Sequence, residues 1–265
     1  MDVFWLWYLL VGAGVGFLAG LLGIGGGLVQ VPVLVFLFTA QKIPSGHVLQ
    51  LALGTAMASI LFTSASSVRA HHSHSAVNWD IVRRMAPGVA SGVAVAAFIA
   101  GRTPTRYLAI FFTAFVYYAA TQLILNIRPT AHRSLPGRAG MFVAGALIGG
   151  ISSVVAAGGA LLSVPYMTWC NVRVHEAIGT AAAVGFPIAI AGSIGYIVNG
   201  WGASGLPPWS LGYIYVPALF WIVAASMLTA PIGARLAHRT PTGRLRKIFA
   251  VLLYILATSM LWNLL

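Results

Sequence analysis

Long apolar runs without charge, separated by short basic loops, dominate the chain. The runs cover 3–41, 48–68, 85–101, 107–127, 139–172, 177–200, 205–234 and 248–265. A membrane-spanning helix needs about 20 apolar residues, with about 17 as a practical minimum. Most of the runs are long enough for one span, whereas the first and the fifth are too long for one. The pattern predicts an all-α polytopic membrane protein with 8–10 membrane segments.

The two longest runs are each interrupted near the middle by small residues followed by a proline. The first contains the glycine-rich stretch 23–27 and then Pro32, and the fifth contains 156–160 and then Pro165. Further similarities appear in the same order when the two prolines are aligned, as internal duplication requires. The alignment pairs Gly12 with Gly145, Gly16 with Gly149 and Gly26 with Gly159. A few residues on, 52–55 matches 177–180, and near the ends of the halves 102–105 matches 239–242.

Two internal repeats, 1–130 and 131–265, are therefore predicted within one integral membrane domain, each with a Gly/Pro-broken first hairpin. The charged residues bear on their orientation. If each repeat has five segments, one side of the membrane receives twelve Lys and Arg and the other receives three. If each broken run crosses once, the division is nine against six. The positive-inside rule favours five segments per repeat, which makes the repeats inverted and puts both termini outside.

Composition narrows the class further. Hydrophobic residues make up 59% of the chain and charged residues 7%, against about 25% charged residues in a soluble domain. A soluble enzyme is therefore excluded. The net charge of +12 reflects the basic loops, which lack the interleaved aromatic residues of a nucleic-acid surface, so we expect the lipid bilayer and no nucleic acid as partner.

The two interruptions are the best candidates for a binding site. Non-helical backbone is tolerated at membrane depth where it lines a cavity, and matched breaks in two halves are typical of transporter sites. We expect Pro32 and Pro165 to begin short helices and residues 25–31 to be non-helical. Two helix N-termini that meet in the membrane would bind an anion. The expected substrate-binding residues are Gly25, Gly26, Gly27, Gln30, Thr55, Gly158, Gly159, Ser163 and Thr180.

Other glycines and polar residues have a structural interpretation. Glycines at a spacing of four, at 12, 16 and 20 and again at 145 and 149, predict close helix packing. Packing is also the alternative role for the two breaks and the two Gly-Thr pairs. His175 and Glu176 begin a span, where they would cap the helix or form a gating pair. The chain has no acidic residue inside a span, which argues against an acidic proton relay.

No other group of residues predicts chemistry. The histidines at 71, 72 and 74 lie in a basic loop without a neighbouring carboxylate, and metal sites of the usual kinds need more suitable ligands. The spans contain no Ser/His/Asp arrangement. We expect no metal, no cofactor and no catalytic residue, so the chain is not an enzyme.

Several motifs resemble the sulfite exporter TauE/SafE family of membrane transporters. They are the stretch GLLGIGGGLVQVP at 20–32, Gly158-Gly159-Ala160 followed by Val164-Pro165, both Gly-Thr pairs, and Asn78-Trp79. The resemblance implies a multi-pass protein of the cell membrane, in bacteria the inner membrane, that transports small sulfur-containing anions such as sulfite or sulfonates. We expect a secondary transporter or exporter that works by alternating access. A channel-like anion pathway and a transporter of a non-sulfur organic anion are the alternatives.

Overall fold

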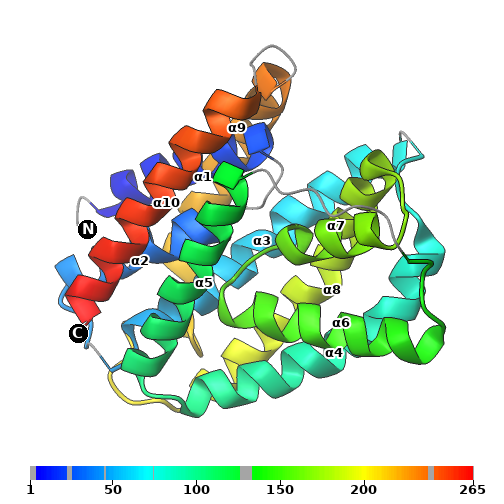
Figure 1. Ribbon diagram of the computed structural model, residues 1–265. Helices are drawn as coiled ribbons and strands as arrows, with labels where there is room; N and C mark the ends of the chain where they lie inside the picture. The colour runs from blue at the N-terminus through cyan, green and yellow to red at the C-terminus, as the bar shows by residue number, and fades with distance from the viewer. Residues whose placement is uncertain are drawn as a thin grey trace.

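The computed structural model describes residues 4–22, 26–44, 46–73, 75–125, 133–237 and 242–264. Within these ranges the chain folds into ten helices and one small antiparallel sheet (Figure 1). The first five helices are α1 (Phe4–Leu22), α2 (Gly27–Ala40), α3 (Val48–Ser73), α4 (Trp79–Arg102) and α5 (Thr105–Leu125). The other five are α6 (Arg138–Val154), α7 (Ala160–Trp169), α8 (Val174–Gly200), α9 (Val216–Ala237) and α10 (Thr242–Leu264). Strands β1 (Ser210–Leu211) and β2 (Ile214–Tyr215) pair directly before α9.

Helix length and hydropathy confirm the prediction of an all-helical polytopic membrane protein. Among the described helices, α3, α4, α5, α8 and α9 contain apolar stretches long enough to cross a membrane. Helices α1, α2, α6 and α10 are also apolar but have shorter apolar stretches. The ten residues of α7 extend about 15 Å at 1.5 Å per residue, which is half the thickness of a hydrocarbon core of about 30 Å.

Each of the two interrupted runs folds back on itself. Gln41 is the residue directly after α2, and its side chain donates a hydrogen bond to the hydroxyl of Tyr8, near the start of α1. Just before α6, the Arg133 N–H donates to the carbonyl of Trp169, the last residue of α7, at 3.4 Å. Since the end of each run returns to where the run began, α1 with α2 and α6 with α7 are helical hairpins.

Helices α3 and α8 pack against each other across the middle of the bundle (Figure 1). A Cβ atom on Gly54 would lie 3.0 Å from that of Tyr196, and a Cβ atom on Gly192 would lie 2.2 Å from Cε of Met57. As α3 advances, its partner residues on α8 move backwards, so the two helices are antiparallel. Around them, α1 packs on α9, α4 on α6, and α5 on α10.

Glycine seams hold two of these pairs together. On α1, a Cβ atom at Gly12 would lie 2.5 Å from the Ile222 carbonyl oxygen of α9, and Gly16 is equally close to Ser226 of the same helix. On α6, Gly145 approaches the backbone of α4 in the same way. The predicted role of these glycines in close packing is confirmed at 12, 16, 145 and 149; the surroundings of Gly20 lie outside the described residues.

Candidate functional site

Glycine residues begin the two helices that follow the breaks. Gly26 is the N-cap of α2 and Gly159 is the N-cap of α7, and neither makes a side-chain capping bond. The N–H groups of Val29 and Gln30 bond to the Gly26 carbonyl, and those of Leu162 and Ser163 bond to the Gly159 carbonyl. The N–H groups of the first two residues of each helix have no acceptor within the helix, and a cap without a side chain leaves them available to a ligand. Gly159 has φ = 79°, a left-handed conformation that favours glycine. Gly25 lies outside the described residues.

The prolines do not begin these helices, so that prediction is wrong. Pro32 is inside α2 and Pro165 is inside α7. Each is the sixth residue of its helix, and the residues from Gly27 to Val31 are helical. The glycine N-caps end the breaks five residues earlier than expected. The missing N–H of each proline then removes one backbone hydrogen bond inside a helix, which weakens the helix locally rather than starting it.

The structure brings the first break into contact with the second. A Cβ atom on Gly27 would lie 1.8 Å from the carbonyl oxygen of Ala156, in the turn between α6 and α7. The second break in turn rests on α8, because a Cβ atom on Gly185 would lie 2.5 Å from the Gly158 carbonyl oxygen. No side chain larger than hydrogen fits at either contact. The close approach of the two breaks therefore depends on glycine.

Three buried polar side chains beside the breaks have an atom without a hydrogen-bond partner. They are Gln30 at Nε2, Ser163 at Oγ and Ser152 at Oγ. Gln30 and Ser163 are each the fourth residue of their helix, α2 and α7, and Ser152 is near the end of α6. An unpartnered buried donor costs about 1–3 kcal/mol. Such atoms in a folded protein call for an explanation, and a bound ligand provides one.

Unpartnered buried side-chain atoms also occur away from the breaks. They belong to Thr113, Gln122, Ser193 and Ser210. Gln30 and Ser163 differ from these because each lies at the start of a helix whose N-cap is glycine. No hydrogen bond joins Gln30 to Ser163 in the described part of the chain, so each break has its own donor.

The hydroxyls of Thr55 and Thr180 hold backbone segments. Thr55 Oγ1 donates to the carbonyl of Leu51 at 2.7 Å and accepts the N–H of Tyr215, just before α9, at 3.0 Å. Thr180 Oγ1 accepts the N–H of Asn78, just before α4, at 2.9 Å. In this conformation each threonine anchors the start of a helix in the other half of the chain. Direct contact of these two hydroxyls with a substrate stays a prediction. Such contact requires each hydroxyl to exchange its present hydrogen bonds for bonds to the substrate.

Glu176 joins the start of α8 to the start of α4. Its Oε1 accepts from Asn78 Nδ2 at 2.7 Å, while Asn78 Oδ1 accepts the N–H groups of Asp80 and Ile81 and caps α4. Arg173 lies 3.5 Å from the other Glu176 oxygen. A carboxylate in the first turn of a helix is stabilised by the helix dipole. Helix α8 has no side-chain capping bond, because the Glu176 carboxylate bonds Asn78 and Arg173 instead. Gating by Glu176 and the exposed His175 stays a prediction.

The β1–β2 turn covers the start of α3. Tyr213 lies in this turn, with its hydroxyl 3.3 Å from Nδ1 of His47 and the ring centroids 5.5 Å apart. Burial raises the pKa of the Tyr213 phenol, because the charged form loses its hydration. The phenol therefore stays neutral at physiological pH and serves as a hydrogen-bonding group.

Sequence reasoning missed Ser59, the partner of Gln30. Ser59 Oγ lies 2.7 Å from Gln30 Oε1, and both residues are buried. Ser59 follows Thr55 by four residues on α3 and therefore shares its face. That periodicity is a signal for Ser59 as an inward-facing polar residue. Its pairing with Gln30 has no sequence signal, because the two residues lie on different helices.

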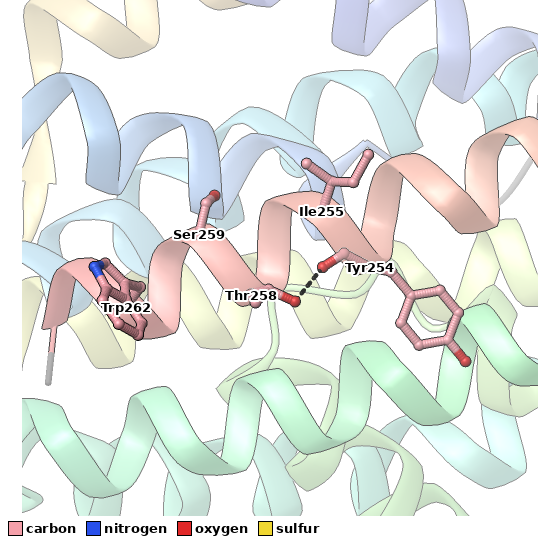
Figure 2. Close-up of a pocket in the computed structure, with 5 residues that line it drawn as sticks. All are labelled: Tyr254, Ile255, Thr258, Ser259 and Trp262. Carbon is pink, nitrogen blue, oxygen red and sulfur yellow. Dashed lines mark hydrogen bonds between the residues drawn. The ribbon is translucent and has the colours of Figure 1, made fainter.

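A shallow groove on α10 has no polar group suited to a substrate (Figure 2). It has a volume of about 530 Å³ and is lined by Tyr254, Ile255, Thr258, Ser259 and Trp262. The Thr258 hydroxyl donates to the Tyr254 carbonyl at 2.7 Å within the helix. Since the groove has no charged residue and Trp262 is 86% exposed, we assign it to the lipid-facing surface.

Comparison with known proteins identifies the family. The family model described as "Sulfite exporter TauE/SafE" matches residues 8–260. The chain belongs to the TauE/SafE family. It is 38% identical over 262 residues to a "Probable membrane transporter protein" of Haemophilus influenzae, which covers 98% of this chain and 99% of the relative. The resemblance inferred from the motifs is thereby confirmed.

More distant relatives match along most of their length as well. A probable membrane transporter protein of Methanocaldococcus jannaschii is 24% identical over 96% of this chain and 94% of its own. One from Bacillus subtilis is 23% identical over 94% of both chains. No solved structure matches the chain. This TauE/SafE protein is thus a multi-pass membrane transporter and not an enzyme.

Proposed function

We propose that this TauE/SafE protein is a secondary transporter, or exporter, that moves a small sulfur-containing anion such as sulfite or a sulfonate by alternating access. The contact of the glycine-capped start of α2 with the turn before α7, beside buried donors that lack partners, carries the proposal. Sulfite and sulfonate oxygens accept hydrogen bonds, and helix N-termini stabilise negative charge. The name of the matching family, which mentions sulfite, supports the choice of substrate.

The scarcity of acidic side chains also favours an anion. The chain contains Asp2, Asp80 and Glu176 as its acidic residues. Asp80 and Glu176 lie in the first turns of α4 and α8, where they pair with Arg84 and Arg173. Among the residues that the structure describes, no carboxylate lies at the breaks to pair with a cation, whereas the unpartnered N–H and O–H groups suit an anion.

Pairs of similar contacts support two inverted repeats, 1–130 and 131–265. Helix α1 packs on α9 and α6 on α4, while α2 packs on α3 and α7 on α8. If α1–α5 and α6–α10 are equivalent, each contact has a counterpart in the other half. Thr55 and Thr180 are also equivalent. Thr55 binds the N–H of the residue before α9, and Thr180 binds the N–H of the residue before α4, the helix equivalent to α9 in the other half.

Inverted repeats suggest how access would alternate. Thr55 and Thr180 lie near the beginnings of the antiparallel helices α3 and α8, so the two anchors are at opposite ends of this helix pair. Release of one anchor at a time would open the breaks to one side of the membrane. With five segments per repeat, the charge bias of twelve against three favours both termini outside.

Flux into liposomes tests the proposal. We expect purified protein to give saturable uptake of sulfite, thiosulfate, sulfoacetate or taurine, together with counterflow. Gln30→Leu and Ser163→Ala should impair uptake, while Ser259→Ala in the α10 groove serves as a control. Uptake that does not saturate indicates a channel, and uptake of carboxylates alone indicates a non-sulfur cargo. Wild-type uptake by both site variants would overturn the assignment of the site.

A further inference from the structure

Among the described residues, the side chain of Gln30 makes one hydrogen bond, to Ser59. Gln30 is 1% exposed and Ser59 is 3% exposed. The Ser59 hydroxyl donates to Gln30 Oε1 at 2.7 Å, and the amide nitrogen Nε2 has no partner. The amide oxygen of Gln30 therefore already accepts a hydrogen bond, and the two N–H donors of the amide nitrogen are left for another molecule.

The Ser59 hydroxyl has two acceptors within reach but one proton. Besides Gln30 Oε1, the Ala56 carbonyl oxygen of the same helix lies 2.8 Å from Ser59 Oγ. When the proton points at Gln30, the amide is fixed with its oxygen towards Ser59. When the proton points at Ala56, Ser59 Oγ can accept, and the amide gains a bond by turning its nitrogen towards Ser59. The direction of one O–H bond thus selects between two amide orientations.

The two orientations give the site opposite preferences. With the oxygen towards Ser59, Gln30 offers two N–H donors, which an anionic oxygen needs. With the nitrogen towards Ser59, Gln30 offers a carbonyl oxygen, which repels an anion. Hydrogen bonds to charged groups are stronger than those between neutral groups. The orientation of one amide therefore affects affinity for an anion more than affinity for an uncharged molecule.

We propose that Ser59 is a positioning residue that orients the Gln30 amide as a donor and thereby makes the site selective for anions. The inference rests on the proposed function, because it assumes that an anion binds beside Gln30. Ser59 acts through Gln30 and does not contact the anion. It follows that loss of the Ser59 hydroxyl weakens binding only as long as Gln30 is present.

A double-mutant cycle separates this role from a structural one. Ser59→Ala should raise the KM for sulfite about fivefold, the factor that corresponds to one ordinary hydrogen bond, with little change in maximal rate. In the Gln30→Leu background the same change should leave KM unaltered. Ser59→Thr keeps the hydroxyl and should stay close to wild type. Ser64→Ala is the matched control, since Ser64 lies on the same helix and its hydroxyl donates to the Leu61 carbonyl within that helix.

The outcomes are distinguishable from failure of the proposed function. If the wild-type protein transports none of the anions, the proposed function is wrong and this inference fails with it. If the wild type transports sulfite but Ser59→Ala behaves like Ser64→Ala, only the role of Ser59 is wrong. Equal KM increases from Ser59→Ala with and without Gln30 would likewise overturn it. Thermal unfolding of each variant in detergent shows whether a lower transport rate reflects a smaller amount of folded protein. The KM of the folded fraction, which does not depend on the amount of protein, then shows whether Ser59 has the proposed role.

Discussion

Replacement of Gly27 by alanine tests the contact between the two breaks. The new Cβ atom would lie 1.8 Å from the Ala156 carbonyl oxygen, whereas carbon and oxygen atoms in contact are normally about 3.3–3.6 Å apart. The start of α2 and the turn after α6 would therefore have to separate by roughly 1.5 Å. Ala156 has φ = 47°, a conformation that is already unfavourable for alanine, so it cannot easily give way.

Overpacking of this kind costs about 1–3 kcal/mol and occasionally more. Gly14→Ala is the matched control, because a Cβ atom there meets nothing within 4 Å and alanine favours a helix by about 1 kcal/mol over glycine. We expect Gly27→Ala to lower the thermal unfolding midpoint in detergent and to abolish uptake by liposomes. Gly14→Ala should keep both or become more stable. If the two variants behave alike, the breaks are not in contact and the assignment of the binding site to them is wrong.

Three further predictions concern single side chains. Gln30→Leu removes an unpartnered buried amide, so the free energy of unfolding should stay equal or rise by up to about 2 kcal/mol. The KM of this variant for sulfite should rise about 10- to 150-fold, as loss of a hydrogen bond to a charged group implies. A loss of stability that accompanies the rise in KM would contradict this prediction. Asn78→Ala removes the α4 cap and the bond to Glu176, and should lower unfolding stability by about 1–2 kcal/mol; an unchanged melting curve would argue against the link. Burial raises the pKa of the Cys170 thiol, so the reactive thiolate is scarce at neutral pH and increases as the pH rises towards that pKa. Maleimide labelling followed by mass spectrometry should be slow at pH 7, faster at pH 9.5 and fastest in SDS, and rapid labelling of the folded protein at pH 7 would contradict the burial.

The sequence predicted much of the fold because lipid imposes strict patterns. The long apolar runs became helices, since every backbone polar group must be satisfied within the membrane. The seams at Gly12 and Gly145 followed from a spacing of four residues. The breaks were found because small residues followed by a proline recur at matching positions in the two halves, as in transporter sites.

The finer geometry could not be predicted, for physical reasons. Pro32 suits the first turn of a helix, but Gly26 caps α2 earlier, and local preference does not decide between two possible starts. Thr55 and Thr180 bind residues more than 100 positions away, and such partners are set by packing of whole helices. Ser59 was missed for the same reason, because its partner lies on α2.

Calorimetric titration of the purified protein with sulfite tests the central claim most directly. The account predicts saturable binding to the wild type that the double variant Gln30→Leu/Ser163→Ala loses, because that variant has neither of the unpartnered donors in the first turns of α2 and α7. Ser64→Ala and Ser259→Ala should bind like the wild type. Equal affinity of the folded double variant and the wild type would contradict the claim that the two helix breaks bind the anion.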